Sequence, residues 1–130
     1  MSIGVDSHVL DTVVQEVAEA FTAYEAALAG NDVDALTGFF WDSPRVVRFG
    51  VVDEQRGAEE VRRWRSSSAG VPAGRWLART DVLPIGEDAA VVTTRFGYGA
   101  GEATGRQTQV WVRLPEGWRI VSAHVSEPLP

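Results

Sequence analysis

Cysteine and lysine are both missing from this chain of 130 residues. Without cysteine it can form neither disulfides nor thiolate metal sites, and two histidines, His8 and His124, are too few for a histidine-rich metal site. We therefore expect no metal and no cofactor. Because lysine is absent, all twelve basic residues are arginines, whose planar guanidinium groups can hold a carboxylate through two hydrogen bonds.

Positive net charge and long apolar runs are missing as well. The net charge of −6 argues against nucleic acid or an anionic membrane as a partner, because both favour basic surfaces. No run of about eighteen apolar residues could span a membrane, and the amino terminus lacks the basic and apolar segments of a signal peptide. We therefore expect a cytoplasmic protein that folds as a single domain over residues 1–130.

Apolar spacing in the first half of the chain predicts helices around one short strand. Apolar residues at steps of three and four predict helices over 7–30, 33–41 and 58–69. A strand is expected over about 45–50, after a proline, and a turn over 55–57, where arginine precedes glycine.

The second half predicts four longer strands over 75–84, 88–98, 105–114 and 117–126. Short turns between long strands indicate an antiparallel meander. Because the order is helix, helix, strand, helix and then four strands, the helices cannot cross between parallel strands. We therefore expect an α+β fold in which three helices pack on one face of a curved antiparallel sheet and leave a pocket between the layers. The residues expected in the core or lining the cavity are Leu10, Val17, Phe21, Leu36, Phe40, Val47, Trp76, Val91, Val110, Trp111 and Ile120.

Arg48 and Tyr24 are the leading candidates for chemistry. Arg48 is an always-charged residue on an otherwise apolar strand, so it must be paired or must await an anion, and we adopt the second interpretation. Tyr24 lies on the apolar stripe of the first helix, either as a core tyrosine or as a hydrogen-bond donor and general acid in the pocket. The carboxylates that could instead pair with Arg48 are Asp42, Asp53, Glu54, Glu59 and Glu60.

Other polar residues are candidates for binding a substrate. Arg65, on the third helix, offers a second guanidinium group. Gln109 lies on the same face of its strand as Gln107, and an amide there suits a urea-like or amide-like ligand unless that face is solvated. His124 is either a satisfied structural residue or a substrate-binding one, and Asp81 is a candidate lone base.

The segments that carry a resemblance to a known family are FTAYEAAL, FFWDSPRVVRFG, VRRWRSS, GRQTQVWV and GWRIVSAHVS. Together they resemble the AtzH-like family of the nuclear transport factor 2-like superfamily, with its cone-shaped, SnoaL-like α+β fold, over residues 8–126. The resemblance implies hydrolytic decarboxylation of dicarboxyurea to allophanate, in oxalurate and cyanuric-acid catabolism alongside an amidase-signature enzyme. It also implies a catalytic tyrosine and arginine, which match Tyr24 and Arg48. Trp64 departs from the family, where phenylalanine is expected.

These observations favour a homodimer formed through the open sheet face, with a pocket for a small carboxylated nitrogen compound. Arg48 would hold a carboxylate while Tyr24 donates a proton to nitrogen. Two alternatives remain open. One is a non-catalytic ligand-binding or assembly module that accompanies an amidase. The other is an isomerase or cyclase that uses Asp81 or His124 as its base.

Overall fold

Residues 6–129 are described by a computed structural model; residues 1–5 and 130, which the predicted domain includes, lie outside the described residues. The elements are α1 (Ser7–Ala29), α2 (Val33–Gly38), β1 (Val47–Phe49), β2 (Glu54–Arg56), α3 (Ala58–Ser67), β3 (Arg75–Pro84), β4 (Ala89–Tyr98), β5 (Gly105–Leu114) and β6 (Gly117–Ser126).

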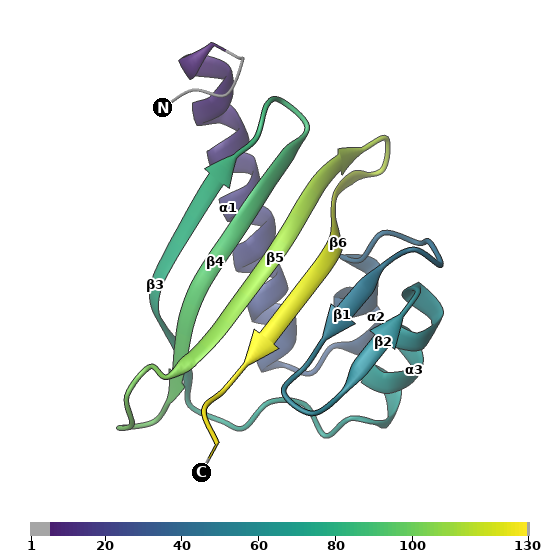
Figure 1. Cartoon of the computed structure of the whole chain (residues 1–130), viewed down its shortest axis with the longest axis vertical. Helices are drawn as coiled ribbons and strands as arrows, with labels where there is room; N and C mark the ends of the chain where they lie inside the picture. Colours follow the sequence, from purple (N-terminus) through teal and green to yellow (C-terminus); the bar gives the residue numbers. More distant parts are fainter. Residues whose placement is uncertain (1–5, 130) are drawn as a thin grey trace.

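The strands form one six-stranded sheet in the order β2-β1-β6-β5-β4-β3 (Figure 1). Strands β3 to β6 form the predicted antiparallel meander. The sheet also contains a parallel pair, β1 with β6, which the prediction of a purely antiparallel sheet missed. Only strands joined by a hairpin must run antiparallel, and the whole meander separates β1 from β6 along the chain. The turn expected over 55–57 is also wrong, because Glu54–Arg56 pairs with β1 as a short strand.

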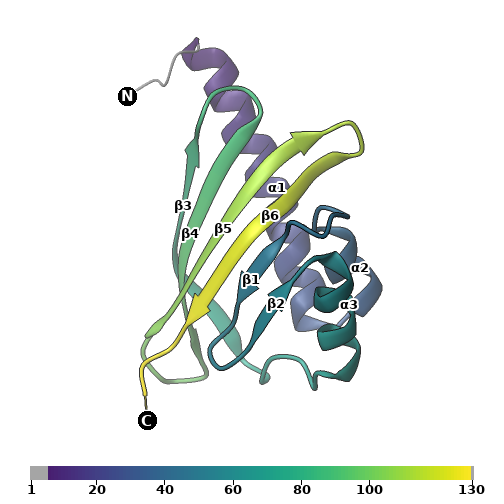
Figure 2. The same cartoon turned by 45° about the vertical axis from the view of Figure 1, so that its right-hand side comes forward.

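The helices pack on one face of this sheet, which confirms the α+β fold class (Figures 1 and 2). Helix α1 lies against β3 and β4, and α3 packs on α2 and beside β2. The apolar stripe of α1 is buried, including Val13, Val17, Phe21, Tyr24 and Leu28. Among the described helices, none is long and apolar enough to cross a membrane.

The sheet register decides which predicted core residues are buried. Val47, Val91 and Val110 are only half-buried, because they point to the face away from the helices, and Val92 fills the core in place of Val91. Where two valines are adjacent, alternation alone does not say which points inward. Trp76 is 39% exposed at the edge strand, where its indole N–H donates to the carbonyl of Gly99 at 3.0 Å. The prediction is confirmed for Leu10, Val17, Phe21, Leu36, Phe40, Trp111 and Ile120.

The start of α3 is fixed by Gly57, whose φ of 92° lies in the left-handed region that glycine adopts most easily. A side chain there would also meet the backbone of Pro44, because a Cβ would lie 3.2 Å from its Cα. The chain therefore turns sharply out of β2 into α3. From this start, Val61 and Arg65, four residues apart, share the buried side of the helix.

Candidate functional site

A cavity of about 430 Å³ opens where α1, α3 and the sheet meet. Tyr24 reaches it from α1, Arg48 from β1, Trp64 and Arg65 from α3, and Arg75 from the start of β3. We call this cavity the arginine pocket. Three of the twelve arginines of this acidic chain line it, together with the carboxylates of Asp53 and Glu127.

Arg48 is buried and already has a counter-ion. Its Nη1 donates to Asp53 Oδ2 at 2.6 Å and to Gln55 Oε1 at 2.8 Å. The interpretation that Arg48 awaits an anion unpaired is therefore wrong. A tight turn is closed by a hydrogen bond from the Gly50 N–H to the Asp53 carbonyl. This turn places the Asp53 carboxylate beside β1. Burial raises the pKa of Asp53, but hydrogen bonds from Gln55 and Arg48 outweigh burial and hold it below the ordinary value.

Arg65 is more deeply buried and has no such counter-ion. Only 3% of the residue is exposed, and its Nη2 donates to the phenol oxygen of Tyr24 at 2.9 Å. Among residues 6–129, no carboxylate lies within ion-pair distance of Arg65, and its buried Nε–H has no acceptor. Burial lowers the pKa of Arg65, and Arg48 adds to this effect, whereas the nearby Tyr24 and the charge of Asp53 oppose it. A buried cation without a counter-ion is costly, so this position favours a bound anion.

The phenol of Tyr24 is the acceptor in its hydrogen bond with Arg65, because a guanidinium group can only donate. Its own hydrogen is therefore free for another acceptor, and no bond donated by Tyr24 is found within the described residues. The Tyr24 ring makes edge-on contacts with the rings of Phe39 and Phe40, with ring centroids 5.9 and 6.5 Å apart, and these contacts hold it in place. Tyr24 can thus donate a hydrogen bond, or a proton, to a ligand in the pocket.

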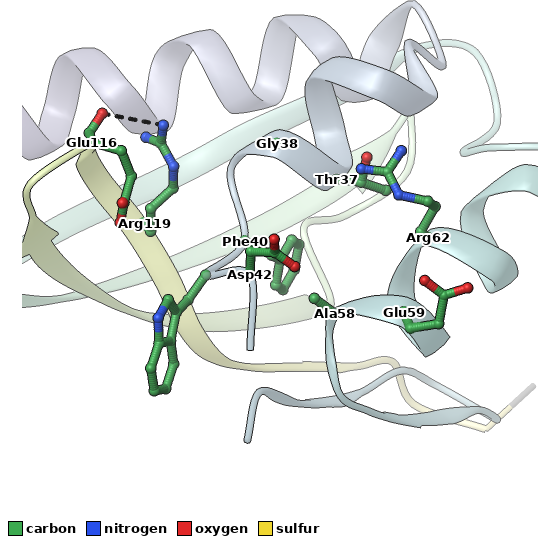
Figure 3. Close-up of a pocket in the computed structure, with 10 residues that line it drawn as sticks. Thr37, Gly38, Phe40, Asp42, Ala58, Glu59, Arg62, Glu116 and Arg119 are labelled. Carbon is green, nitrogen blue, oxygen red and sulfur yellow. Dashed lines mark hydrogen bonds between the residues drawn. The ribbon is translucent and has the colours of Figure 1, made fainter. Parts of the chain in front are cut away.

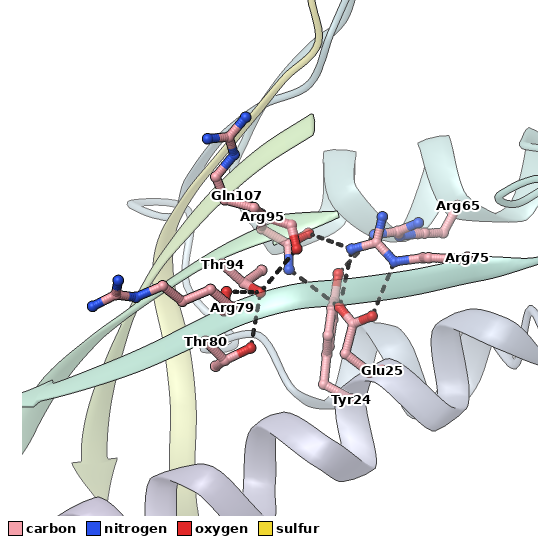
Figure 4. A network of polar contacts seen from close by, with 9 residues as sticks. All are labelled: Tyr24, Glu25, Arg65, Arg75, Arg79, Thr80, Thr94, Arg95 and Gln107. Atoms are coloured by element: carbon pink, nitrogen blue, oxygen red, sulfur yellow. Dashed lines mark hydrogen bonds and ion pairs between the residues drawn. The ribbon is translucent and has the colours of Figure 1, made fainter. Parts of the chain in front are cut away.

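Arg75 is neutralised by Glu25 (Figure 4). Its Nε and Nη2 donate to the two carboxylate oxygens of Glu25 at 2.9 and 3.2 Å, and Gln107 Nε2 donates to the same carboxylate at 3.2 Å. Burial lowers the pKa of Arg75, but the hydrogen bonds and charge of Glu25 outweigh burial and raise it above the ordinary value. The uncompensated positive charge of the pocket therefore lies at its Arg65 end.

Three other candidates from the sequence lie outside the arginine pocket. Gln109 is 1% exposed in the core, where its Oε1 accepts from the Trp111 indole at 3.1 Å. His124 is on the opposite sheet face, with its ring 5.6 Å from that of Phe49. Asp81 is exposed and pairs with Arg79 at 3.0 Å. Across residues 6–129, no group of three or more histidine or acidic side chains is placed to hold a metal ion.

A second hollow, of about 670 Å³, lies between α2, the start of α3 and the turn into β6 (Figure 3). Its two arginines already have partners at the surface. Arg119 donates to the carbonyls of Trp118 and Glu116, and Arg62 lies 3.6 Å from Asp34. Although this hollow is larger, it contains no buried charged group, so the arginine pocket is the stronger candidate.

Comparisons with known proteins agree with this architecture. The sequence profile of the AtzH-like family matches residues 7–128. A cystatin-like fold protein from Burkholderia xenovorans LB400 is 44% identical, with a TM-score of 0.85 over 92% of this chain and 95% of that one. A protein of unknown function from the DUF3225 family of Pectobacterium atrosepticum is 42% identical, with a TM-score of 0.85 over 91% and 92%.

A nuclear transport factor 2-like protein from Salmonella enterica serovar Typhimurium is 28% identical, with a TM-score of 0.74 over 92% of this chain and 94% of that one. No curated protein matches the sequence.

Proposed function

Because this chain belongs to the AtzH-like family of the nuclear transport factor 2-like superfamily, we propose that it decarboxylates a small carboxylated urea-type compound in the arginine pocket. Dicarboxyurea, with allophanate as the product, is the substrate that the family resemblance suggests. The observation that supports the proposal most is the buried guanidinium group of Arg65, which contacts the phenol of Tyr24 and has no carboxylate of residues 6–129 within ion-pair distance.

In this proposal the arginines hold the anionic end of the substrate. Arg65 supplies a charge that forms no ion pair with a carboxylate among residues 6–129, and Arg48 adds a second guanidinium group that Asp53 partly compensates. Hydrogen bonds between a guanidinium group and a carboxylate are about twice as strong as those between neutral groups, and they fix orientation as well. The division of roles therefore differs from the sequence expectation, with Arg65 rather than Arg48 as the main anion contact.

The proposed chemical step needs one proton. The bond between nitrogen and the carboxylate carbon breaks, its electron pair stays on nitrogen, and carbon dioxide leaves. Nitrogen takes up the proton that Tyr24 donates, and solvent returns a proton to the phenolate. Tyr24 suits this role because its hydrogen is not used in the bond with Arg65.

Two alternatives differ in how well the geometry supports them. A ligand-binding module that accompanies an amidase requires only the anion contact, which the arginine pocket offers. An isomerase or cyclase based on Asp81 or His124 is disfavoured, because both side chains lie outside the pocket. The amidase partner and the cytoplasmic location remain predictions.

Release of carbon dioxide from dicarboxyurea by the purified protein tests the proposal. The Tyr24→Phe variant should lose about 100-fold or more in rate, the scale of a missing general acid. Tyr98→Phe removes the other phenol of the pocket, which Arg65 does not contact, and should reduce the rate far less. If the protein binds the compound but releases no carbon dioxide, the binding module is the better account. Equal rates in the wild type and Tyr24→Phe would remove Tyr24 from the mechanism.

A further inference from the structure

One aromatic ring contacts both guanidinium groups at the Arg65 end of the pocket. The Cζ of Arg48 lies 4.1 Å from the centroid of the Trp64 ring, and the Cζ of Arg65 lies 4.6 Å from it. The two guanidinium carbons can therefore be no farther apart than these two distances combined. Trp64 is half-buried at the pocket wall, next to Arg65 in the sequence.

The two guanidinium groups repel each other, so something must hold them together. Asp53 and Gln55 hold Arg48, whereas among residues 6–129 the polar side-chain contact of Arg65 is with Tyr24 alone. An indole face attracts a cation through its quadrupole and carries no net charge. Trp64 can therefore fix the position of both cations without neutralising either, which a carboxylate in its place could not do.

The charges at this end leave room for one anion. Arg48 and Arg65 carry two positive charges, and Asp53 supplies the one carboxylate that pairs with either of them among the described residues. Counting these three groups, one net positive charge remains beside the Trp64 ring. That charge suits a single carboxylate or a similar planar oxyanion.

We propose that Trp64 is a positioning residue that holds Arg48 and Arg65 so that both guanidinium groups face one anionic group of the ligand. This inference rests on the proposed function, because it assigns the anionic end of the substrate to these arginines. It explains why an aromatic residue, Trp64, lies in the pocket wall directly before the buried Arg65 of α3. Trp64 does not touch the reacting atoms in this account and acts through the two arginines.

Calorimetric titration with malonate, a small dicarboxylate, tests the role of the ring. Trp64→Leu removes the aromatic face, and affinity should fall about tenfold or more, because the cation–π attraction at a desolvated site is then missing. Trp64→Phe keeps an aromatic face and should stay within about threefold of the wild type. The control Trp41→Phe changes a tryptophan that lines the second hollow and should leave the affinity unchanged.

Wild-type affinity in Trp64→Leu would overturn the proposal. Equal losses in the phenylalanine and leucine variants would also overturn it, because bulk rather than the aromatic face would then matter. If the wild type itself fails to bind malonate, the anion site that the proposed function requires is contradicted. If the wild type binds malonate and the Trp64 variants bind it equally well, only the role of Trp64 is contradicted.

Tryptophan fluorescence gives a second test in case Trp64→Leu does not fold. Malonate should change the emission of the wild type and of Trp41→Phe, and the change should be absent in Trp64→Phe. An undiminished emission change in Trp64→Phe would overturn the proposal.

Discussion

Two buried arginines of the same pocket differ in their counter-ions. Arg48 has the carboxylate of Asp53 at 2.6 Å, whereas Arg65 has a phenol at 2.9 Å and a buried Nε–H that finds no acceptor in the described part of the chain. Burial alone therefore does not identify an anion site. What identifies it is a buried charge that the protein itself leaves uncompensated.

Removing the counter-ion of Arg48 should strengthen anion binding. Asp53→Asn keeps an oxygen that can accept from Arg48 and removes the negative charge, so malonate should bind about three- to tenfold more tightly. Glu54→Gln makes the same charge change at an exposed neighbour that pairs with Arg56 and should leave the affinity unchanged. Weaker binding in Asp53→Asn would mean that Asp53 is needed to hold Arg48 in place.

The same variant should alter acid stability. The folded pKa of Asp53 lies below its unfolded value, so its carboxylate stabilises the fold above the ordinary aspartate range, near pH 4. This stabilisation is lost as the pH falls through the lower folded pKa. Denaturant unfolding of Asp53→Asn should therefore show a smaller loss of stability on acidification than the wild type, and an identical loss would contradict the assignment.

At the scale of elements, long periodic segments could be predicted and short or distant pairings could not. The apolar stripe of α1 and the four strands β3 to β6 show repeated spacing over ten residues or more, and the structure confirms them. Strand β2 has only three residues, too few to show a period of two. The parallel pairing of β1 with β6 leaves no local signal at all.

The same limit applies to the site. The sequence indicated Tyr24 and Arg65 because each lies on the inward side of a helix, but not that they meet. They are 41 positions apart, and Glu25 and Arg75 are 50 apart. The pairing of Arg48 with Asp53 is local, five positions apart, and Asp53 was one of several carboxylates within reach. Packing of α3 on α2 and beside β2, rather than any motif, decides which arginine lies without an ion-pair partner among the described residues.

For the whole molecule, we predict a homodimer through the sheet face that the helices leave uncovered. Val47, Val91 and Val110 point to that face, and Leu83 is 53% exposed on it, which favours burial against a second copy. Sedimentation at micromolar concentration should show a dimer, and Val110→Asp should convert it to a monomer. Val52→Asp, at a turn position that is 94% exposed, is the matched control and should stay dimeric. Sedimentation of the wild type as a monomer would show that the dimer prediction is wrong.

The central claim is that Arg65 provides the uncompensated charge that binds the anionic end of the ligand. Titration of malonate into the wild type and into Arg65→Gln, both shown to be folded by circular dichroism, tests this claim most directly. We predict one malonate bound per chain in the wild type and an affinity at least tenfold lower in Arg65→Gln, as expected for losing charge-assisted hydrogen bonds. Equal affinity in the two proteins would contradict the claim.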